Sequence, residues 1–91
     1  MEPLEELARQ QQQNLSDFLR LEIALASTML ELAKTTVVDE RRKQLLGKVQ
    51  LAIDTVRHFK GRIADREFGT HLDSEADRIE SLAAGVRGSA G

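Results

Sequence analysis

Two histidines, His58 and His71, are the side chains of this 91-residue chain best suited to proton transfer. Asp54, His58 and Arg62 stand four residues apart, so a helix would hold the imidazole beside a carboxylate in one tautomer. The same spacing is typical of a surface ladder of ion pairs, and we favour this interpretation. We assign no catalytic residue and expect that the protein is not an enzyme.

The second histidine lies in a row of acidic groups. Glu67, His71 and Glu75 also stand four apart, and this row could bind a divalent metal if one helix ran through Gly69. A structural site normally needs a fourth protein ligand, and the chain has no cysteine. No glycine-rich phosphate loop, GxSxG or HExxH motif is present. We therefore expect neither a metal nor a cofactor.

Basic residues cluster between positions 41 and 66, where eight Lys and Arg accompany two acids. Residues 1–40 carry eight acids and three bases, and residues 67–80 carry five acids and one base. Clustered cations can bind phosphates, but here they fall on both flanks of a helix, without aromatic platforms for stacking. A small nucleic-acid-associated regulator is an alternative. We favour a basic middle helix that lies between two acidic helices and pairs with them.

The elements that position these groups are predicted to be helices. Leu, Ala, Glu, Arg, Lys and Gln dominate the composition, which favours an all-α fold. Apolar residues four and three apart indicate one packed face on the middle helix. This seam consists of Leu45, Val49, Ala52, Val56, Phe59 and Ile63.

Two breaks divide the chain into three helices. Thr36 and Asp39 have the spacing of a capping box at the first break. At the second, Gly69 would cap one helix, and Thr70 with Asp73 would start the next. We predict an antiparallel three-helix bundle with helices near 4–35, 39–67 and 70–86.

The domain limits follow from where the apolar residues lie. We predict an N-terminal extension at 1–14, helical or frayed, a bundle at 15–86 and a flexible tail at 87–91. Twelve apolar residues between 15 and 33 fit no single helix face, so other helices or a partner chain should cover them from more than one direction. If Gly69 lay inside one long helix, two hairpins could pair as a homodimeric four-helix bundle.

A second stripe lies opposite the seam of the middle helix. It comprises Gly47, Leu51, Asp54, His58 and Gly61, again four and three apart. Each glycine inside a helix costs roughly 1 kcal/mol relative to alanine, and the missing side chains would let another segment come close. We predict that this stripe binds a partner.

Three segments together resemble the microtubule-interacting and trafficking (MIT) domain. They are alanine-spaced leucines ending the first helix, LLGKVQLAIDTVRHF in the second and HLDSEADRIESL in the third, covering about residues 15–84. The tyrosine-bearing pattern usual in the family's second helix is missing. The resemblance implies a three-helix bundle that binds helical peptides in grooves between helices. It would place Leu72, Ala76, Ile79 and Leu82 along such a groove, flanked by Asp73, Glu75 and Asp77.

The function predicted from the sequence is a non-enzymatic protein-interaction module. It would accept an amphipathic helix from a partner or a second copy of itself. No secretory signal is visible at the amino terminus, and the longest uncharged apolar stretch, residues 23–30, is too short to span a bilayer. We expect a soluble cytoplasmic protein without a membrane span.

Overall fold

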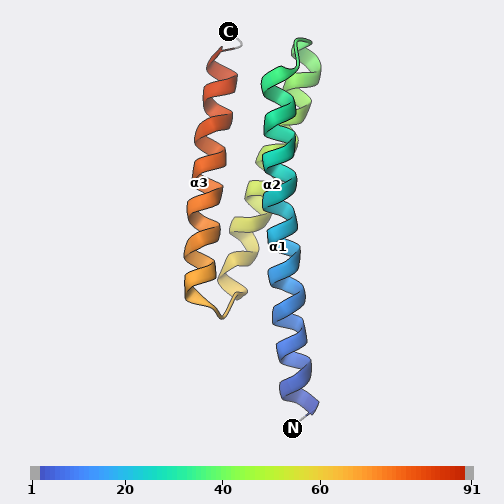
Figure 1. Cartoon of the computed structure of the whole chain (residues 1–91), viewed down its shortest axis with the longest axis vertical. Coiled ribbons are helices and arrows are strands. Elements are labelled where there is room, and N and C mark those ends of the chain that lie inside the picture. Colours follow the sequence, from blue (N-terminus) through green and yellow to red (C-terminus); the bar gives the residue numbers. More distant parts are fainter. Residues whose placement is uncertain (1–2, 90–91) are drawn as a thin grey trace.

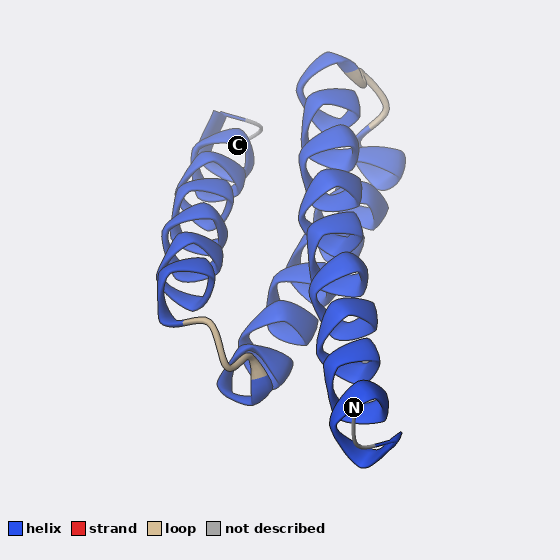
Figure 2. Ribbon diagram, turned by 60° about the horizontal axis from the view of Figure 1, so that its bottom comes forward, coloured by secondary structure: helices blue, strands red, loops and turns tan. Residues whose placement is uncertain are grey.

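The computed structural model describes residues 3–89, and regular structure within that range is entirely helical (Figure 1). The helices are α1 (Pro3–Thr35), α2 (Asp39–Phe59) and α3 (Arg66–Ser89), with a single 3-10 turn, η1 (Lys60–Arg62), after α2. Among residues 3–89, non-helical backbone is confined to the two connections between α helices (Figure 2). The predicted all-α class with three helices is confirmed.

The molecule is a rod of 57 × 19 × 16 Å. Its long dimension follows the length of α1. Figure 1 shows α1 rising from the N-terminal end, α2 descending behind it, and α3 rising again on the other side of α2. The first turns of α1 project beyond the connection between α2 and α3. The 33 residues of α1 thus provide more surface than the two shorter helices cover.

The core runs along the rod as two apolar clusters. The smaller one joins all three helices through Leu19, Val56 and Leu72, each at most 1 % exposed. The predicted seam is confirmed for the residues of α2 from 45 to 56, whereas Phe59 and Ile63 are only half-buried. No polar or charged side chain is buried in the described range. The larger cluster contains Ala26, Leu30, Ala33, Leu45, Leu46, Val49, Ala52, Ile53, Ala76, Ile79 and Ala83.

The packing of the helices differs in one respect from the packing predicted from charge. The acidic helices α1 and α3 contact each other as well as the basic α2. Leu19 of α1 and Leu72 of α3 belong to the same buried cluster, so apolar burial brings the two acidic helices together. Repulsion between exposed acids is weak by comparison because water screens it.

The first break lies at residues 36–38, as predicted, but not because of a capping box. Val38 occupies the N-cap position of α2 without a side-chain hydrogen bond. The Thr36 hydroxyl donates instead to the Leu32 carbonyl, at 2.6 Å, and so completes the end of α1. Asp39 forms an ion pair with Arg42. The predicted Thr36–Asp39 capping box is therefore wrong.

The second predicted break, at Gly69, is also wrong. Gly69 lies inside α3, and its amide donates to the Asp65 carbonyl at 3.0 Å. Asp65 caps the helix, since its Oδ1 accepts from the amides of Glu67 (3.0 Å) and Phe68 (3.2 Å). An Asp at an N-cap satisfies amides that no helical carbonyl can reach, which favours a helix start at residue 66 over one at Thr70.

Replacing Asp65 with alanine tests this assignment. We expect the Asp65→Ala variant to lose about 1 kcal/mol of unfolding free energy, because two amides of α3 lose their acceptor. Thr70→Ala is the matched control, since Thr70 lies within α3 and alanine is the better helix former. Urea denaturation followed by circular dichroism measures both. A larger loss for Thr70→Ala would contradict the observed start of α3.

The predicted extension at 1–14 is helical from Pro3 onward. Gln12 ties it to the second connection: its amide nitrogen donates to the Arg62 carbonyl at 2.8 Å, and its oxygen accepts from the Ala64 amide at 3.0 Å. At the other end α3 continues to Ser89, beyond the predicted limit at 86. Residues 1, 2, 90 and 91, parts of the predicted extension and tail, lie outside the described residues.

Candidate helix-docking surface

The stripe predicted on α2 lies at the surface. Gly47, Leu51, Asp54, His58 and Gly61 are all exposed, and Leu51 retains 67 % of its accessible surface. A methyl group added at Gly47 or Gly61 would meet nothing within 4 Å, so neither glycine is needed for packing inside the chain. Gly61 belongs to η1 and not to α2. One leucine among polar residues and glycines offers little apolar surface.

The three predicted binding residues of α3 lie elsewhere. Leu72, Ala76 and Ile79 are at most 1 % exposed and pack in the core, and Leu72 also lines the cleft between α1 and α3 that is described below. The structure therefore does not combine them with the α2 stripe into one open surface, because the helices themselves cover them. That any of the eight predicted residues binds a partner stays a prediction.

The histidine rows form no metal-binding cluster in the described part of the chain. Asp54 accepts a hydrogen bond from Gln50 at 3.0 Å, whereas the His58 ring packs edge-on against Phe59, with centroids 4.7 Å apart. Within residues 3–89 no three His, Cys, Asp or Glu side chains are grouped closely enough to hold a metal ion. We assign no function to either histidine row.

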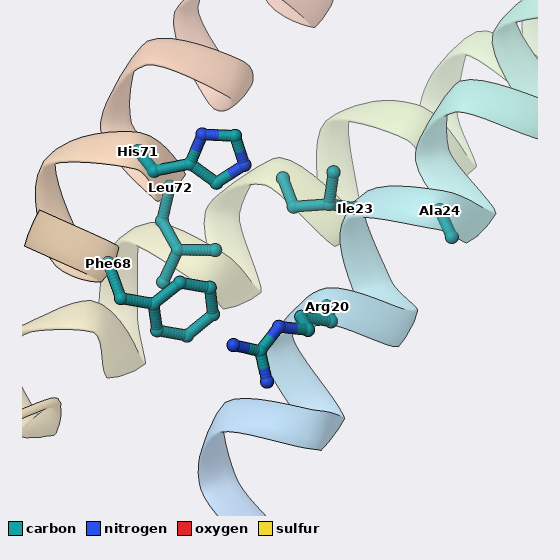
Figure 3. Close-up of a pocket in the computed structure, with 6 residues that line it drawn as sticks. All are labelled: Arg20, Ile23, Ala24, Phe68, His71 and Leu72. Atoms are coloured by element: carbon teal, nitrogen blue, oxygen red, sulfur yellow. The ribbon is translucent and has the colours of Figure 1, made fainter.

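A cleft between α1 and α3 offers a more concave surface (Figure 3). Its volume is about 410 Å³, and its lining is mainly apolar. The Arg20 guanidinium lies 4.4 Å from the centroid of the Phe68 ring, and His71 stacks on the same ring with centroids 6.5 Å apart. The cleft thus has an apolar floor beneath two basic side chains. Its lining residues are Arg20, Ile23, Ala24, Phe68, His71 and Leu72.

An exposed apolar stripe on α1 adjoins this cleft. Leu21, Leu25 and Leu32 retain 69 %, 49 % and 50 % of their accessible surface, and Phe18 retains 41 %. Ala24, exposed on the rim of the cleft, follows Leu21 by three residues and so connects the two surfaces. We call the line Phe18, Leu21, Leu25 and Leu32 the α1 stripe. Exposed apolar side chains gathered on one face of a helix mark a candidate interaction site.

The spacing of residues in the sequence, but not the composition, indicates the α1 stripe. Residues 18, 21, 25 and 32 keep to a spacing of three, four and seven, which is a heptad pattern distinct from the buried line of Leu19, Ala26 and Ala33. The expectation that the whole apolar set of α1 is covered from several directions is not met within one chain. Both α2 and α3 pack on the buried line and leave the three leucines of the stripe largely uncovered. Phe18, at the N-terminal end of the stripe, packs edge-on against Phe59 of α2, with ring centroids 6.2 Å apart.

Ion pairs from α2 and from the η1 turn that follows it to α3 account for part of the basic segment. Arg57 donates to Glu80 at 2.8 and 3.1 Å and to Asp77 at 2.8 Å, and Lys60 pairs with Asp73. Hydrogen bonds from Arg57, then from Gln50, lower the pKa of Glu80, and the same acids raise the pKa of Arg57. These ion pairs bear out the predicted pairing for α3, one of the two acidic helices.

The lowered pKa of Glu80 predicts how stability depends on pH. Its folded-state pKa lies below the ordinary value of 4.5, so its contribution is present above that value and is lost as pH falls through the folded pKa. We expect Arg57→Met to flatten the decline in unfolding free energy from pH 5 downward, in urea titrations at successive pH values. Lys48→Met, an exposed change on α2, is the control. Identical slopes for parent and Arg57→Met would contradict this assignment.

Comparison with known proteins found no relative. No protein-family model, curated protein or solved structure matches the chain. In the described range, none of the three helices combines the length and apolar character needed to cross a membrane. The candidate function therefore rests on the geometry of the α1 stripe and the adjoining cleft.

Proposed function

We propose that this chain is a non-enzymatic protein-interaction module whose α1 stripe and adjoining cleft accept an amphipathic helix. The observation that carries the proposal is the exposure of Leu21, Leu25 and Leu32, each near or above half of its surface, in one line on one helix. Two helices that pair along their length do so through apolar residues at this heptad spacing on each helix. The α2 stripe, with Leu51 as its large apolar residue, is less suited to this role.

The bundle itself provides a rigid support for such a surface. The path of α2 back along α1, and of α3 back along α2, supports the antiparallel arrangement that we propose for the three helices. The buried leucines fix the rotation of α1 about its axis, so the stripe faces solvent and needs no rearrangement to bind. The MIT-like resemblance is a further reason to propose a helical ligand, and it remains a resemblance in sequence pattern alone.

A synthetic helix with leucines at both heptad core positions and glutamine beside them tests the proposal. We expect it to shift amide resonances of residues 18–32 in the isotope-labelled chain. Fully burying a leucine contributes about 1.5–3 kcal/mol, so replacing two half-exposed leucines should weaken binding by at least about tenfold. The variant Leu21→Gln/Leu25→Gln measures this loss.

Leu51→Gln is the matched control, because it removes an equally exposed leucine from α2. It should bind the synthetic helix as the parent does. Absence of any shift in α1 at millimolar peptide, or an equal loss in the Leu51→Gln variant, would refute the proposed site.

Self-association is the alternative that the same stripe favours, since a second copy could cover it. Light scattering across a tenfold concentration range would detect a dimer, and Leu21→Gln/Leu25→Gln would dissociate a dimer formed through the stripe. The nucleic-acid alternative gains less support, because Arg57 and Lys60 are engaged by acids of α3.

A further inference from the structure

We infer that the helix bound by the α1 stripe carries Lys or Arg beside its apolar residues and belongs to a partner protein, not to a second copy of this chain. This inference rests on the proposed function and names the class of ligand for the same site. It follows from the charges that flank the stripe.

The flanking positions of the α1 stripe contain acids and no bases. In heptad terms, residues 18, 25 and 32 occupy one core position and residues 21 and 28 the other, so the flanks are 17, 24, 31 and 15, 22, 29. The charged members are Asp17, Glu22 and Glu31. The side chains of Asp17 and Glu31 are 62 % and 69 % exposed. In paired helices these flanking charges face those of the other helix and decide which partner is accepted.

A second copy would bring acid against acid in the registers that align the leucines. In a parallel, in-register pair, Asp17 would face Glu22 of the other helix. In an antiparallel pair with Leu21 opposite Leu25, Glu22 would face its own counterpart and Asp17 would face Glu31. Like charges at these positions are unfavourable, whereas Lys or Arg at the same places would be attracted.

The bases of α1 near the stripe do not cancel this acidity. Arg20 lies over the Phe68 ring on the cleft side and is 3.6 Å from Asp17, and Lys34 contacts Glu31 at 2.9 Å. Exposed pairs three residues apart contribute little to stability. A basic side chain from the partner could therefore bind the outward oxygens of these acids or replace the internal base.

The docking length is limited by the geometry of the helix. A heptad line drifts by about 20° per heptad on a straight helix, so the two heptads from Phe18 to Leu32 remain on one face over about 21 Å. Leu4 and Leu7 continue the line at the N-terminal end, but Gln11 and Asn14 interrupt it. A partner helix of four turns is sufficient to cover the stripe.

Three synthetic helices that share the leucine framework and differ only beside it test the inference. The flanking residues are Lys in one, Gln in the second and Glu in the third. We expect the Lys helix to bind at least about tenfold more tightly than the Glu helix, with the Gln helix between them, and the difference to shrink at high salt. The dissociation constants are measured by titrating the labelled chain.

A charge-reversed chain provides the decisive comparison. In Asp17→Lys/Glu31→Lys the order of the Lys and Glu helices should invert. Glu5→Lys/Glu6→Lys changes the net charge equally in the first turn of α1, away from the stripe, and should retain the parental order. Inversion in both variants would show that total charge alone decides the preference and would overturn the inference.

The failures of the two proposals are distinguishable. Equal binding of the Lys and Glu helices would overturn the charge inference but leave the docking function in place. A chain that is dimeric in light scattering, and monomeric as Leu21→Gln/Leu25→Gln, would identify a second copy as the occupant and also overturn the inference. Failure of all three helices to perturb α1 would refute the docking function itself.

Discussion

Replacing Ile79 with alanine is expected to remove about 2–5 kcal/mol of unfolding free energy. Ile79 is fully buried in the larger cluster of the core, so the truncation leaves a cavity that neighbouring helices can fill only in part. Native proteins typically have about 0.05–0.15 kcal/mol of stability per residue, which corresponds to roughly 5–14 kcal/mol for a chain of this length. The variant should therefore unfold at a clearly lower urea concentration, with a nearly unchanged dependence on denaturant.

Leu82→Ala is the matched control on the same helix, since Leu82 retains 39 % of its accessible surface. It should cost distinctly less than Ile79→Ala. The comparison also addresses the role predicted for Ile79 from the sequence. A variant of Ile79 that is fully stable but defective in binding a helix would contradict its position in the core and favour a role in docking.

The second large effect is expected at Leu19. This residue is 0 % exposed and belongs to the cluster that joins α1, α2 and α3, so Leu19→Ala should also cost about 2–5 kcal/mol. Leu21, two positions later, is 69 % exposed. Leu21→Ala should change the unfolding free energy by no more than about 0.5 kcal/mol, since surface substitutions rarely do more.

Urea denaturation measures the unfolding free energy of these two variants. Both carry the same substitution on opposite faces of one helix, so a difference between them reports burial and not the type of side chain. Comparable losses at both positions would mean that Leu21 is covered in solution. In that case light scattering would reveal whether a second copy provides the cover. A small loss at Leu19 would contradict the packing of α1 against the other helices.

The apolar seam of α2 was predictable because a helix that packs on its neighbours must place its apolar residues at a period of about 3.6. Leu45, Val49, Ala52 and Val56 follow this period and are buried. On α3, the MIT-like resemblance placed Leu72, Ala76 and Ile79 along a binding groove, because a helical period does not distinguish a core from a groove. Burial assigns them to the core.

The second helix break was not predictable from residue preferences alone. Gly69 and Thr70 have the types expected at a helix end and a helix start, and Asp65 has the type expected at an N-cap. The structure selects Asp65. With the break there, Gln12 of α1 contacts the backbone of Arg62 and Ala64, and Leu72 and Ile79 reach the core. These contacts join residues far apart in the sequence, so a local pattern does not contain them.

The sequence by itself determined the helical class, the approximate extent of α1 and the residues that line the core of α2, because these depend on local propensity and periodicity. Only the tertiary structure decided which apolar residues of α1 are buried. Two shorter helices cover one line of a longer, nearly all-round apolar helix, and the opposite line, from Phe18 to Leu32, remains exposed. The candidate docking surface exists because three helices of this length cannot cover every apolar face of α1.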